Sequence, residues 1–387
     1  MDWQQLFRIQ KHLHQNPELS FEEHDTTEFI ASVLQEWGIP FHRFKGLKTG
    51  GYADVGTNNA RIFAFRSDID ALPIEEERSH AIVSQRPGVM HACGHDFHTT
   101  IGLGLLKYFS ENPQALNGTL RVVFQPGEEA APGGAEKVVQ EKIWQGVRSI
   151  LTLHVQPQVP TGTFVLFHGA VQASSTSLHL TLKGPGGHTS RPYETADLIH
   201  IAGQYVVQLQ ALVRQKTDPR ETVVLAFGSV HGGSTHNIIP DEVVLRGTLR
   251  TLDNQVLANS LDLIRAFSAD FAALHKIDID VTFPTNCPAT VNDRYLSAQF
   301  AEFLKTYRKG TPLMEPEKPS LGSDDFSFYL SKVPGLYLLM GGGGVGNLHS
   351  GQLQLDANLL KPAVETLTGF FSFLSQQPEN VPEKEIA

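Results

Sequence analysis

The sequence predicts an α/β protein in which a mainly parallel sheet, covered by helices, is interrupted by a smaller α+β domain. Short, nearly continuous apolar strands alternate with helices towards both ends of the chain, which is typical of a parallel sheet buried on both faces. Between these two parts the order changes to strand, helix, strand, strand, helix, strand. The length of 387 residues also favours two or more domains over a single hydrophobic core.

The first expected elements are two helices, at residues 3–14 and 20–37. Ser20 and Glu23 have the spacing of a capping box, and Gly38 follows the last apolar residue of the second helix. Apolar and β-branched runs then predict the strands of the sheet, and a further helix is expected to start at His98. The strands are expected at residues 61–66, 119–124, 149–153 and 336–340.

The middle of the chain predicts one complete β-α-β-β-α-β unit, the ferredoxin-like pattern. Its elements are expected at residues 177–183, 196–214, 222–230, 243–251, 254–275 and 277–283. We therefore expect one domain inserted into another. Residues 1–173 and 286–387 would form the catalytic domain, and residues 174–285 a lid or dimerisation domain.

The composition excludes several functional classes. The chain has 31 Lys and Arg against 41 Asp and Glu, a formal charge of −10, which argues against a nucleic-acid or anionic-membrane surface. The first residues show no signal-peptide pattern, and no apolar run approaches the roughly 20 residues of a membrane span. The two cysteines, Cys93 and Cys287, exclude a disulfide framework. We expect a cytoplasmic protein with a small-molecule substrate and with neither nucleic-acid nor membrane partners.

Polar clusters directly follow the four predicted sheet strands. They are Asp68-Ile69-Asp70, the run from Gln125 to Glu129, His154, and the run from Gly341 to His349. If these strands are parallel neighbours, all four clusters open at one edge of the sheet, where ligands bind in such folds. Carboxylates and imidazoles that converge there predict a metal site.

A fifth cluster, from His91 to His98, precedes a predicted helix. Cys93 and His95 are two residues apart with Gly94 between them, so a thiolate and an imidazole can reach a common metal ion. The alternative is that Cys93 is a small buried hydrophobic residue and the histidines are structural. The carboxylates and the imidazole at the other strand ends favour the metal site.

Glu128 and Glu129 are adjacent at a strand end, so their side chains point in different directions and can hold different roles. One can bind metal while the other faces the substrate. Such a carboxylate can take a proton from water and pass it to a leaving amine. Taken alone, a glutamate pair would more often be a solvated loop.

Seven motifs together resemble the amidohydrolases of a co-catalytic metallopeptidase family, which includes aminoacylases, hippurate hydrolases, indole-acetyl-amino-acid hydrolases and N-acetyldiaminopimelate deacetylases. The resemblance spans roughly residues 3–375. The motifs are Arg66-Ser-Asp68-Ile-Asp70-Ala-Leu-Pro73, His91-Ala-Cys93-Gly-His95-Asp96-Phe-His98, Gln125-Pro-Gly-Glu128-Glu129, Leu153-His154-Val155, Gly186-Gly-His188-Thr-Ser190, Asn237-Ile-Ile-Pro240 and Leu348-His349-Ser350.

The resemblance implies two divalent metal ions. Cys93 would bridge them, Glu129 and His349 would complete one site, and His95 and His154 would complete the other. Glu128 would be the general acid and base, and Asp70 would orient the ligands. A thiolate with imidazoles suits zinc, and manganese, cobalt or nickel are alternatives.

Two further residues of the fifth cluster have no assigned ligand role. Asp96 is expected to support a ligand from behind, and His98 either does the same or has a structural role at a helix start.

The resemblance also assigns roles within the inserted domain. His188 would reach the active site of a partner subunit and stabilise the oxyanion, so a homodimer formed through the inserted domain is expected. Asn237 and Arg250 are candidates for binding the substrate's carbonyl or carboxylate. The alternatives are an ordinary glycine-rich turn for His188 and a strand-face salt bridge for Arg250.

The function implied is metal-dependent hydrolysis of N-acyl amino acids to a carboxylic acid and a free amino acid. A dipeptidase or carboxypeptidase of the same fold is one alternative, and a non-catalytic binding or scaffolding homologue is another. Asp324 stands where the family usually has Glu before Asp-Phe, and its side chain is one methylene shorter.

Overall fold

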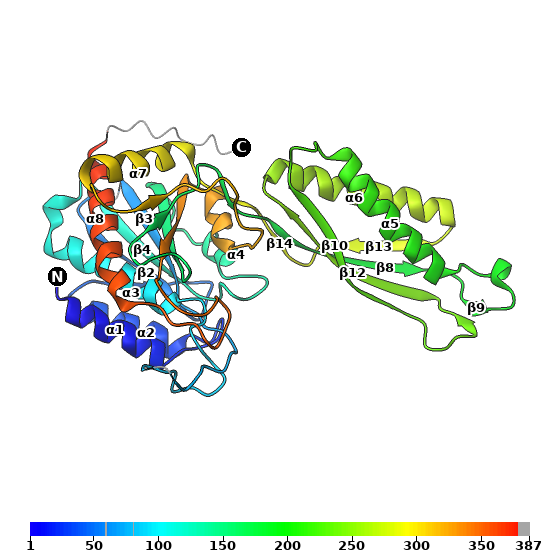
Figure 1. The fold of residues 1–387 in the computed structure, drawn as a ribbon, viewed down its shortest axis with the longest axis horizontal. Coiled ribbons are helices and arrows are strands. Elements are labelled where there is room, and N and C mark those ends of the chain that lie inside the picture. Colours follow the sequence, from blue (N-terminus) through cyan, green and yellow to red (C-terminus); the bar gives the residue numbers. More distant parts are fainter. Residues whose placement is uncertain (59, 80, 378–387) are drawn as a thin grey trace. The chain divides into compact units, whose positions relative to one another are not determined.

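The computed structural model describes residues 1–58, 60–79 and 81–377. It divides into two compact units (Figure 1). Residues 1–169, 292–318 and 325 onward form the first unit, and residues 170–291 and 319–324 form the second. The inserted domain expected at residues 174–285 lies within the second unit.

The first unit is built on a sheet whose strand order, among the described residues, is β1-β2-β4-β3-β5-β17-β6-β16. The bounds are β1 Phe41–Arg43, β2 Gly51–Gly56, β3 Ile62–Asp68, β4 Thr119–Gln125, β5 Val147–Gln156, β6 Phe164–Val165, β16 Leu313–Met314 and β17 Gly335–Gly341.

The four strands predicted from the sequence are the central strands β4, β3, β5 and β17, and they are parallel neighbours. Towards the edges, β1 and β2 pair antiparallel, β2 pairs antiparallel with β4, and β6 pairs antiparallel with β17. The sheet is therefore mixed, but its central pairings and the edge pair of β6 and β16 are parallel, as a mainly parallel sheet requires. Its central strands are buried along their length, as strands covered on both faces must be.

Helices cover the sheet of the first unit (Figure 1). They are α1 Trp3–Gln15, α2 His24–Glu36, α3 His95–Glu111, α4 Ala135–Val138, α7 Arg294–Tyr307 and α8 Leu360–Gln376, with short 3-10 turns at Pro113–Ala115, Asp325–Ser331 and Ala357–Leu359. Among the described residues, no helix combines the length and apolar content needed to cross a membrane.

Helix α3 lies closer to its neighbours than a helix with larger side chains could. A Cβ atom on Gly102 would lie 2.9 Å from Val122 of the sheet, and one on Gly104 would lie 2.9 Å from Val364 of α8. The helix is consequently buried over most of its length. This packing fixes the N-terminal end of α3, which begins at His95, beside the ends of the strands.

The expected helix at residues 20–37 begins instead at His24, and the capping-box prediction is wrong. The Ser20 hydroxyl donates to the carboxylate of Asp70 (2.6 Å) rather than to the start of α2. Phe21 follows with a φ of 65°, in the left-handed region that a residue with a Cβ rarely adopts. The chain therefore turns at this point and does not enter a helix.

The second unit has the element order β-α-β-β-α-β that the sequence predicts, in an antiparallel sheet of order β10-β12-β8-β13. Every second residue of β8 is buried, which places the helices against one face of this sheet. The main bounds are β8 Ser175–Lys183, α5 Leu198–Lys216, β10 Val223–Gly232, β12 Glu242–Thr251, α6 Asn254–His275 and β13 Asp278–Thr282. Short pieces complete it: β7 Ala170–Gln172, β9 Gly187–His188, the 3-10 turn Pro192–Glu194, β11 Ile238–Ile239, β14 Asn286–Cys287 and β15 Thr290–Val291.

Candidate metal centre

The polar clusters meet at one edge of the sheet, because the central strands end there together. β3 ends at Asp68 and β4 at Gln125, and His154 lies near the end of β5. In register, Asp68 pairs with Gln125, and His154 pairs with Leu339 of β17. The predicted convergence of the clusters is confirmed.

Cys93, His95 and His154 form one group of potential metal ligands. Their Sγ and ring nitrogen atoms all lie within 4.8 Å of one another, and all three residues are buried. The Cys93 Sγ is 3.4 Å from the His154 Nε2. One cation could therefore contact all three side chains.

A second group contains Cys93, Glu129 and His349, again with ligand atoms within 4.8 Å of one another. The His349 Nε2 is 3.2 Å from the Glu129 Oε1. His349 has a φ of 60°, and its backbone amide donates to the carbonyl oxygen of Ala92 (2.8 Å). That bond holds His349 next to the loop of Cys93, so the structure brings together both ligand sets that the resemblance implied.

Hydrogen bonds fix which nitrogen of two histidines faces the centre. The His95 Nδ1 lies 2.9 Å from the carbonyl oxygen of Asp70, and the His154 Nδ1 lies 2.8 Å from that of Val155. A carbonyl oxygen only accepts, so each Nδ1 carries the proton and each Nε2 presents its lone pair to the centre. The His95 Nε2 is buried and has no hydrogen-bond partner, as expected for a nitrogen that binds a metal ion.

These residues fit a pair of divalent cations. Burial, and after it the charges of Glu129, Glu128 and Asp68, holds the pKa of the Cys93 thiol well above its usual range. The centre thus concentrates negative charge that a bound cation would compensate. Binding a cation would drive the proton off the thiol, because thiolate is the form that ligates.

Asp70 is placed to orient two of the ligands. Its Oδ1 is 3.2 Å from the His95 Nδ1, and its Oδ2 accepts the backbone amide of Glu129 (3.0 Å). Burial opposes its ionisation, but the hydrogen bond and charge of His95 lower the pKa of Asp70 below its usual value. The structure places Asp70 behind the ligands, in a positioning role.

Asp68 is a functional residue to which the sequence reasoning gave no role. Its Oδ1 lies 2.6 Å from the His98 Nδ1, and its Oδ2 lies 2.5 Å from the Arg66 guanidinium. The Oδ2 also lies 3.7 Å from the His95 Nε2, near the centre. Its position at the end of a buried strand was the available signal.

His98 supports this arrangement from α3. The Val155 amide donates to its Nε2 (3.0 Å), so its Nδ1 carries the proton and donates to Asp68. His98 therefore joins Asp68 to the backbone of β5 beside the centre.

Glu128 lies beside the two ligand groups. Its Oε2 is 3.9 Å from the His95 Nε2, as is the Oε1 of Glu129. Both side chains are about one-tenth exposed, so each carboxylate can reach the centre and remain open to a substrate. The adjacent glutamates thus present two carboxylates to the same nitrogen from one loop.

The remaining predicted residues lie in the second unit. His188 in β9 pairs with Ile238 in β11, and the Thr189 amide donates to the Asn237 carbonyl oxygen (3.2 Å), so His188 and Asn237 are neighbours. The paired strands border a cavity of about 510 Å³. Arg250 lies on β12 and donates to the Leu321 carbonyl oxygen (2.8 Å), not to a carboxylate.

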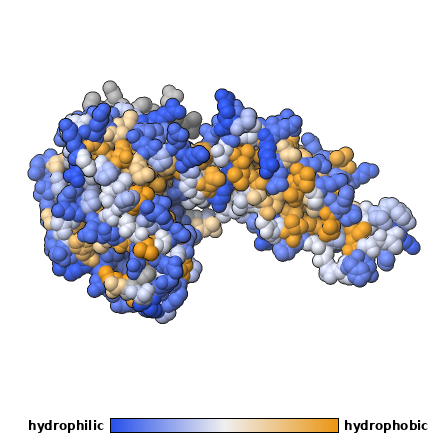
Figure 2. All heavy atoms as spheres, viewed as in Figure 1, coloured by the Kyte–Doolittle hydropathy of each residue, from blue (hydrophilic) through white to orange (hydrophobic). Residues whose placement is uncertain are grey.

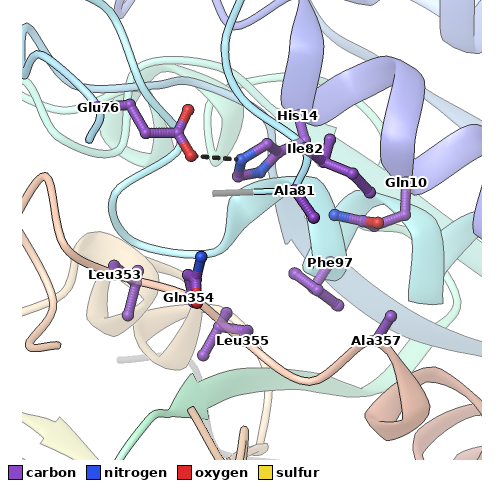
Figure 3. A pocket seen from close by; sticks show the side chains of 10 residues that line it. All are labelled: Gln10, His14, Glu76, Ala81, Ile82, Phe97, Leu353, Gln354, Leu355 and Ala357. Carbon is purple, nitrogen blue, oxygen red and sulfur yellow. Dashed lines mark hydrogen bonds and ion pairs between the residues drawn. The ribbon is translucent and has the colours of Figure 1, made fainter. Parts of the chain in front are cut away.

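Asp96 points away from the centre, although it follows His95 directly. Its Oδ2 accepts from the side chains of Gln10 (2.7 Å) and His14 (2.9 Å) of α1. The other ring nitrogen of His14 contacts Glu76 (3.0 Å), beside a cavity of about 240 Å³ (Figure 3). The expectation that Asp96 supports a ligand from behind is therefore wrong for its side chain, which ties α3 to α1.

His14 should make the stability of the protein depend on pH. Burial lowers the pKa of His14, but the hydrogen bonds and charges of Asp96 and Glu76 outweigh this and raise it to about 10. Because the folded pKa exceeds the unfolded one, this stabilisation is complete below about pH 6.5 and disappears as pH rises through about 10.

We therefore expect His14→Gln to lower the free energy of unfolding by about 3–5 kcal/mol at pH 6, as when one partner of a buried pair is removed. The loss should shrink steadily towards pH 10 in urea unfolding experiments. An equal loss at pH 6 and pH 10 would contradict the pairing.

Comparison with known families identifies the chain. Residues 64–372 match the model of peptidase family M20/M25/M40. The chain belongs to this family. In its fold, the predicted ligands converge from the ends of three strands, β4, β5 and β17, and from the start of α3.

The similar proteins are enzymes that act on amide bonds. The chain is 36% identical to an N-acetyl-L-cysteine deacetylase of Bacillus subtilis (91% of this chain, 84% of the relative). It is 34% identical to an N-acetyldiaminopimelate deacetylase of the same organism (96% and 99%). A Saccharolobus solfataricus protein named thermostable carboxypeptidase 2 is 32% identical (93% and 92%).

Among solved structures, the Bacillus subtilis YXEP protein, described as a dinuclear metal-binding peptidase from the M20 family, superimposes with a TM-score of 0.83. It is 30% identical, over 96% of this chain and 98% of that one. This M20 protein is accordingly a metal-dependent hydrolase of amide bonds, and the non-catalytic alternative is set aside.

Proposed function

We propose that this M20 enzyme hydrolyses N-acyl amino acids to a carboxylic acid and a free amino acid, using two divalent metal ions. The observation that carries the proposal is the pair of ligand groups that share Cys93, with Glu128 beside them. Cys93, His95 and His154 would hold one ion, and Cys93, Glu129 and His349 the other. The deacetylase relatives support the substrate class.

The proposed mechanism assigns each step to a side chain of this protein. Bound divalent ions would polarise the acyl carbonyl and make water more acidic. Glu128 takes the proton of the attacking water and then passes it to the leaving amine. His188 of a second copy would stabilise the oxyanion, and Asn237 and Arg250 would bind the substrate's carbonyl or its free carboxylate.

We further propose zinc as the native metal. The thiolate and imidazoles support this choice, because soft and borderline ligands favour zinc. The carboxylate of Glu129 also suits manganese, cobalt or nickel. Elemental analysis of the purified protein, grown with all four metals available, distinguishes among them.

The carboxypeptidase alternative is supported by the thermostable carboxypeptidase relative. The two substrate classes differ at the amino terminus of the substrate, which is acylated in one and a peptide chain in the other. We expect the protein to cleave acetyl-, benzoyl- or indole-acetyl-amino acids faster than unblocked dipeptides, and a chelator to abolish this. Faster cleavage of dipeptides or longer peptides would establish the alternative.

The second unit is proposed to be a ferredoxin-like lid through which two copies associate. Ile199, Gly203, Val207 and Ala211 are exposed at four-residue spacing, which places them on one face of α5. Figure 2 shows hydrophobic residues gathered over the helices of this unit. A second copy would cover them.

We also propose a cytoplasmic location, which the low cysteine content favours.

A charge on this face should prevent association. Val207 is 68% exposed, so Val207→Glu costs little in the folded monomer but places a carboxylate in the proposed interface. We expect light scattering after size exclusion to give a dimer for the natural protein and a monomer for this variant. Gln208→Glu, next to it on the exposed surface, should remain dimeric. A monomeric natural protein would contradict the proposal.

A further inference from the structure

We infer that Glu23 is a positioning residue for the loop that carries Glu128 and Glu129. This rests on the proposed function, because it assumes that these glutamates are the base and a metal ligand. Glu23 lies in the segment where the sequence predicts a capping box. It is fully buried, although it belongs to neither ligand group.

Backbone amides of the glutamate loop donate to buried carboxylates at three points. The bonds are Gly127 N to Glu23 Oε1 (2.8 Å), Glu129 N to Asp70 Oδ2 (3.0 Å) and Ala135 N to Asp325 Oδ2 (3.0 Å). The loop is therefore fixed before, at and after the two glutamates. Glu23 and Asp70 hold the amides on the two sides of Glu128, and Glu23 is the acceptor on the side towards β4.

Glu23 can hold this amide because its other contacts fix its carboxylate. The same Oε1 accepts the backbone amide of Phe21 (2.8 Å), and the Oε2 accepts the Thr49 hydroxyl (2.7 Å). Burial, and after it the charge of Asp70, raises the pKa of Glu23 to about 7. The two oxygens of Glu23 together accept three hydrogen bonds, so we infer that the loop depends on its acceptor atoms.

The Phe21 ring packs against the same loop. A Cβ atom on Gly127 would lie 2.6 Å from the ring, so the glycine allows the backbone to pass close beside it. The Lys137 ammonium lies 4.8 Å from the ring centre. The left-handed backbone of Phe21, held by Glu23, aims this ring at the loop.

Two other residues near Glu23, Ser20 and Glu18, contact Asp70 and the residue that follows it. The Ser20 hydroxyl donates to the Asp70 Oδ2 (2.6 Å), and the Ala71 amide donates to the Glu18 carbonyl oxygen (2.7 Å). Asp70 in turn contacts His95 and the Glu129 amide. One turn of the chain thus connects the loop of the base with the residue that orients two ligands.

Glu18 provides a matched control. It is a buried glutamate of the same segment, and its carboxylate accepts the backbone amides of Asp25 (3.2 Å) and Thr26 (2.7 Å) at the start of α2. Its carboxylate also pairs with Arg86. It contacts nothing in the glutamate loop, so Glu18→Ala tests the loss of a buried carboxylate without loss of positioning.

The experiment compares Glu23→Ala, Glu23→Gln and Glu18→Ala by steady-state kinetics at saturating metal, metal content, and hydrogen exchange of the loop in metal-free protein. We expect Glu23→Ala to lower kcat by about 10–100-fold and to accelerate exchange in residues 126–135. Glu23→Gln, whose amide oxygen can still accept both backbone amides, should restore kcat to within about threefold. Glu18→Ala should leave kcat and loop exchange unchanged, even if its melting temperature falls.

Equal kcat and equal loop exchange in the two alanine variants would overturn the inference, as would a Glu23→Gln protein as slow as Glu23→Ala. If Glu23→Ala does not fold, Glu23→Asp replaces it, because the shorter side chain cannot reach both amides. Full activity of Glu23→Asp would then overturn the inference. An active Glu128→Gln protein would refute the proposed base. Hydrogen exchange of residues 126–135 tests whether Glu23 positions the loop, and this result does not depend on turnover.

Discussion

Glu128→Gln is expected to retain both metal ions and to lose turnover by about 10²–10⁴-fold, equivalent to roughly 3–5 kcal/mol of barrier. Glutamine has almost the same shape as glutamate but cannot take the proton of the attacking water. Glu128 also lies within reach of His95 and Glu129, but it belongs to neither of the two groups containing Cys93 that are proposed to hold the ions, so we expect its replacement to leave metal bound. The measurements are kcat on the best N-acyl amino acid and elemental analysis of the same sample.

Glu136→Gln provides the control, because Glu136 is an exposed glutamate further along the same segment. It should keep full activity. Near-normal turnover of Glu128→Gln would refute the proposed mechanism. A large loss of metal from that variant would instead make Glu128 a ligand.

Cys93→Ser is the second substitution with a large expected effect. Cys93 belongs to both ligand groups, so its loss weakens two sites at once. A neutral serine hydroxyl replaces thiolate poorly as a ligand for soft or borderline metals. We expect bound metal to fall below one ion per chain after dialysis, and activity to fall at least about 100-fold.

Cys287→Ser separates this effect from a general loss of thiol. The Cys287 Sγ contacts the backbone carbonyl oxygens of Pro288 (3.7 Å) and Asp324 (3.5 Å), and Cys287 belongs to neither ligand group. This variant should bind metal normally. Unchanged metal stoichiometry in Cys93→Ser would remove Cys93 from the ligand set.

Much of the fold could be predicted because the strongest signals are local. The four central strands are apolar runs buried on both faces, and the helix at Asn254–His275 has the predicted bounds. The edges of the sheet could not be predicted. β6 and β16 are two residues long, too short to show a period.

The convergence of the polar clusters could be predicted because a parallel sheet brings the ends of distant strands together, whereas the two ligand sets were implied by the family resemblance. The supporting residues could not, because their partners are set by contacts through space. Ser20 and Glu23 match a capping box in sequence, yet in the structure they bond Asp70 and Gly127. Asp96 follows a ligand in sequence, yet its side chain turns to α1, because adjacent helical residues face different directions.

The central claim is that two metal ions, sharing Cys93, make this protein an amidohydrolase. The most direct test removes metal with a chelator, restores zinc stepwise, and measures bound metal and hydrolysis of N-acyl amino acids on the same samples. We predict negligible activity without metal and an activity that stops rising once about two ions are bound per chain. In Cys93→Ser, activity should not reach such a plateau at two bound ions. Full activity in metal-free protein, or saturation at one ion per chain, would contradict the claim.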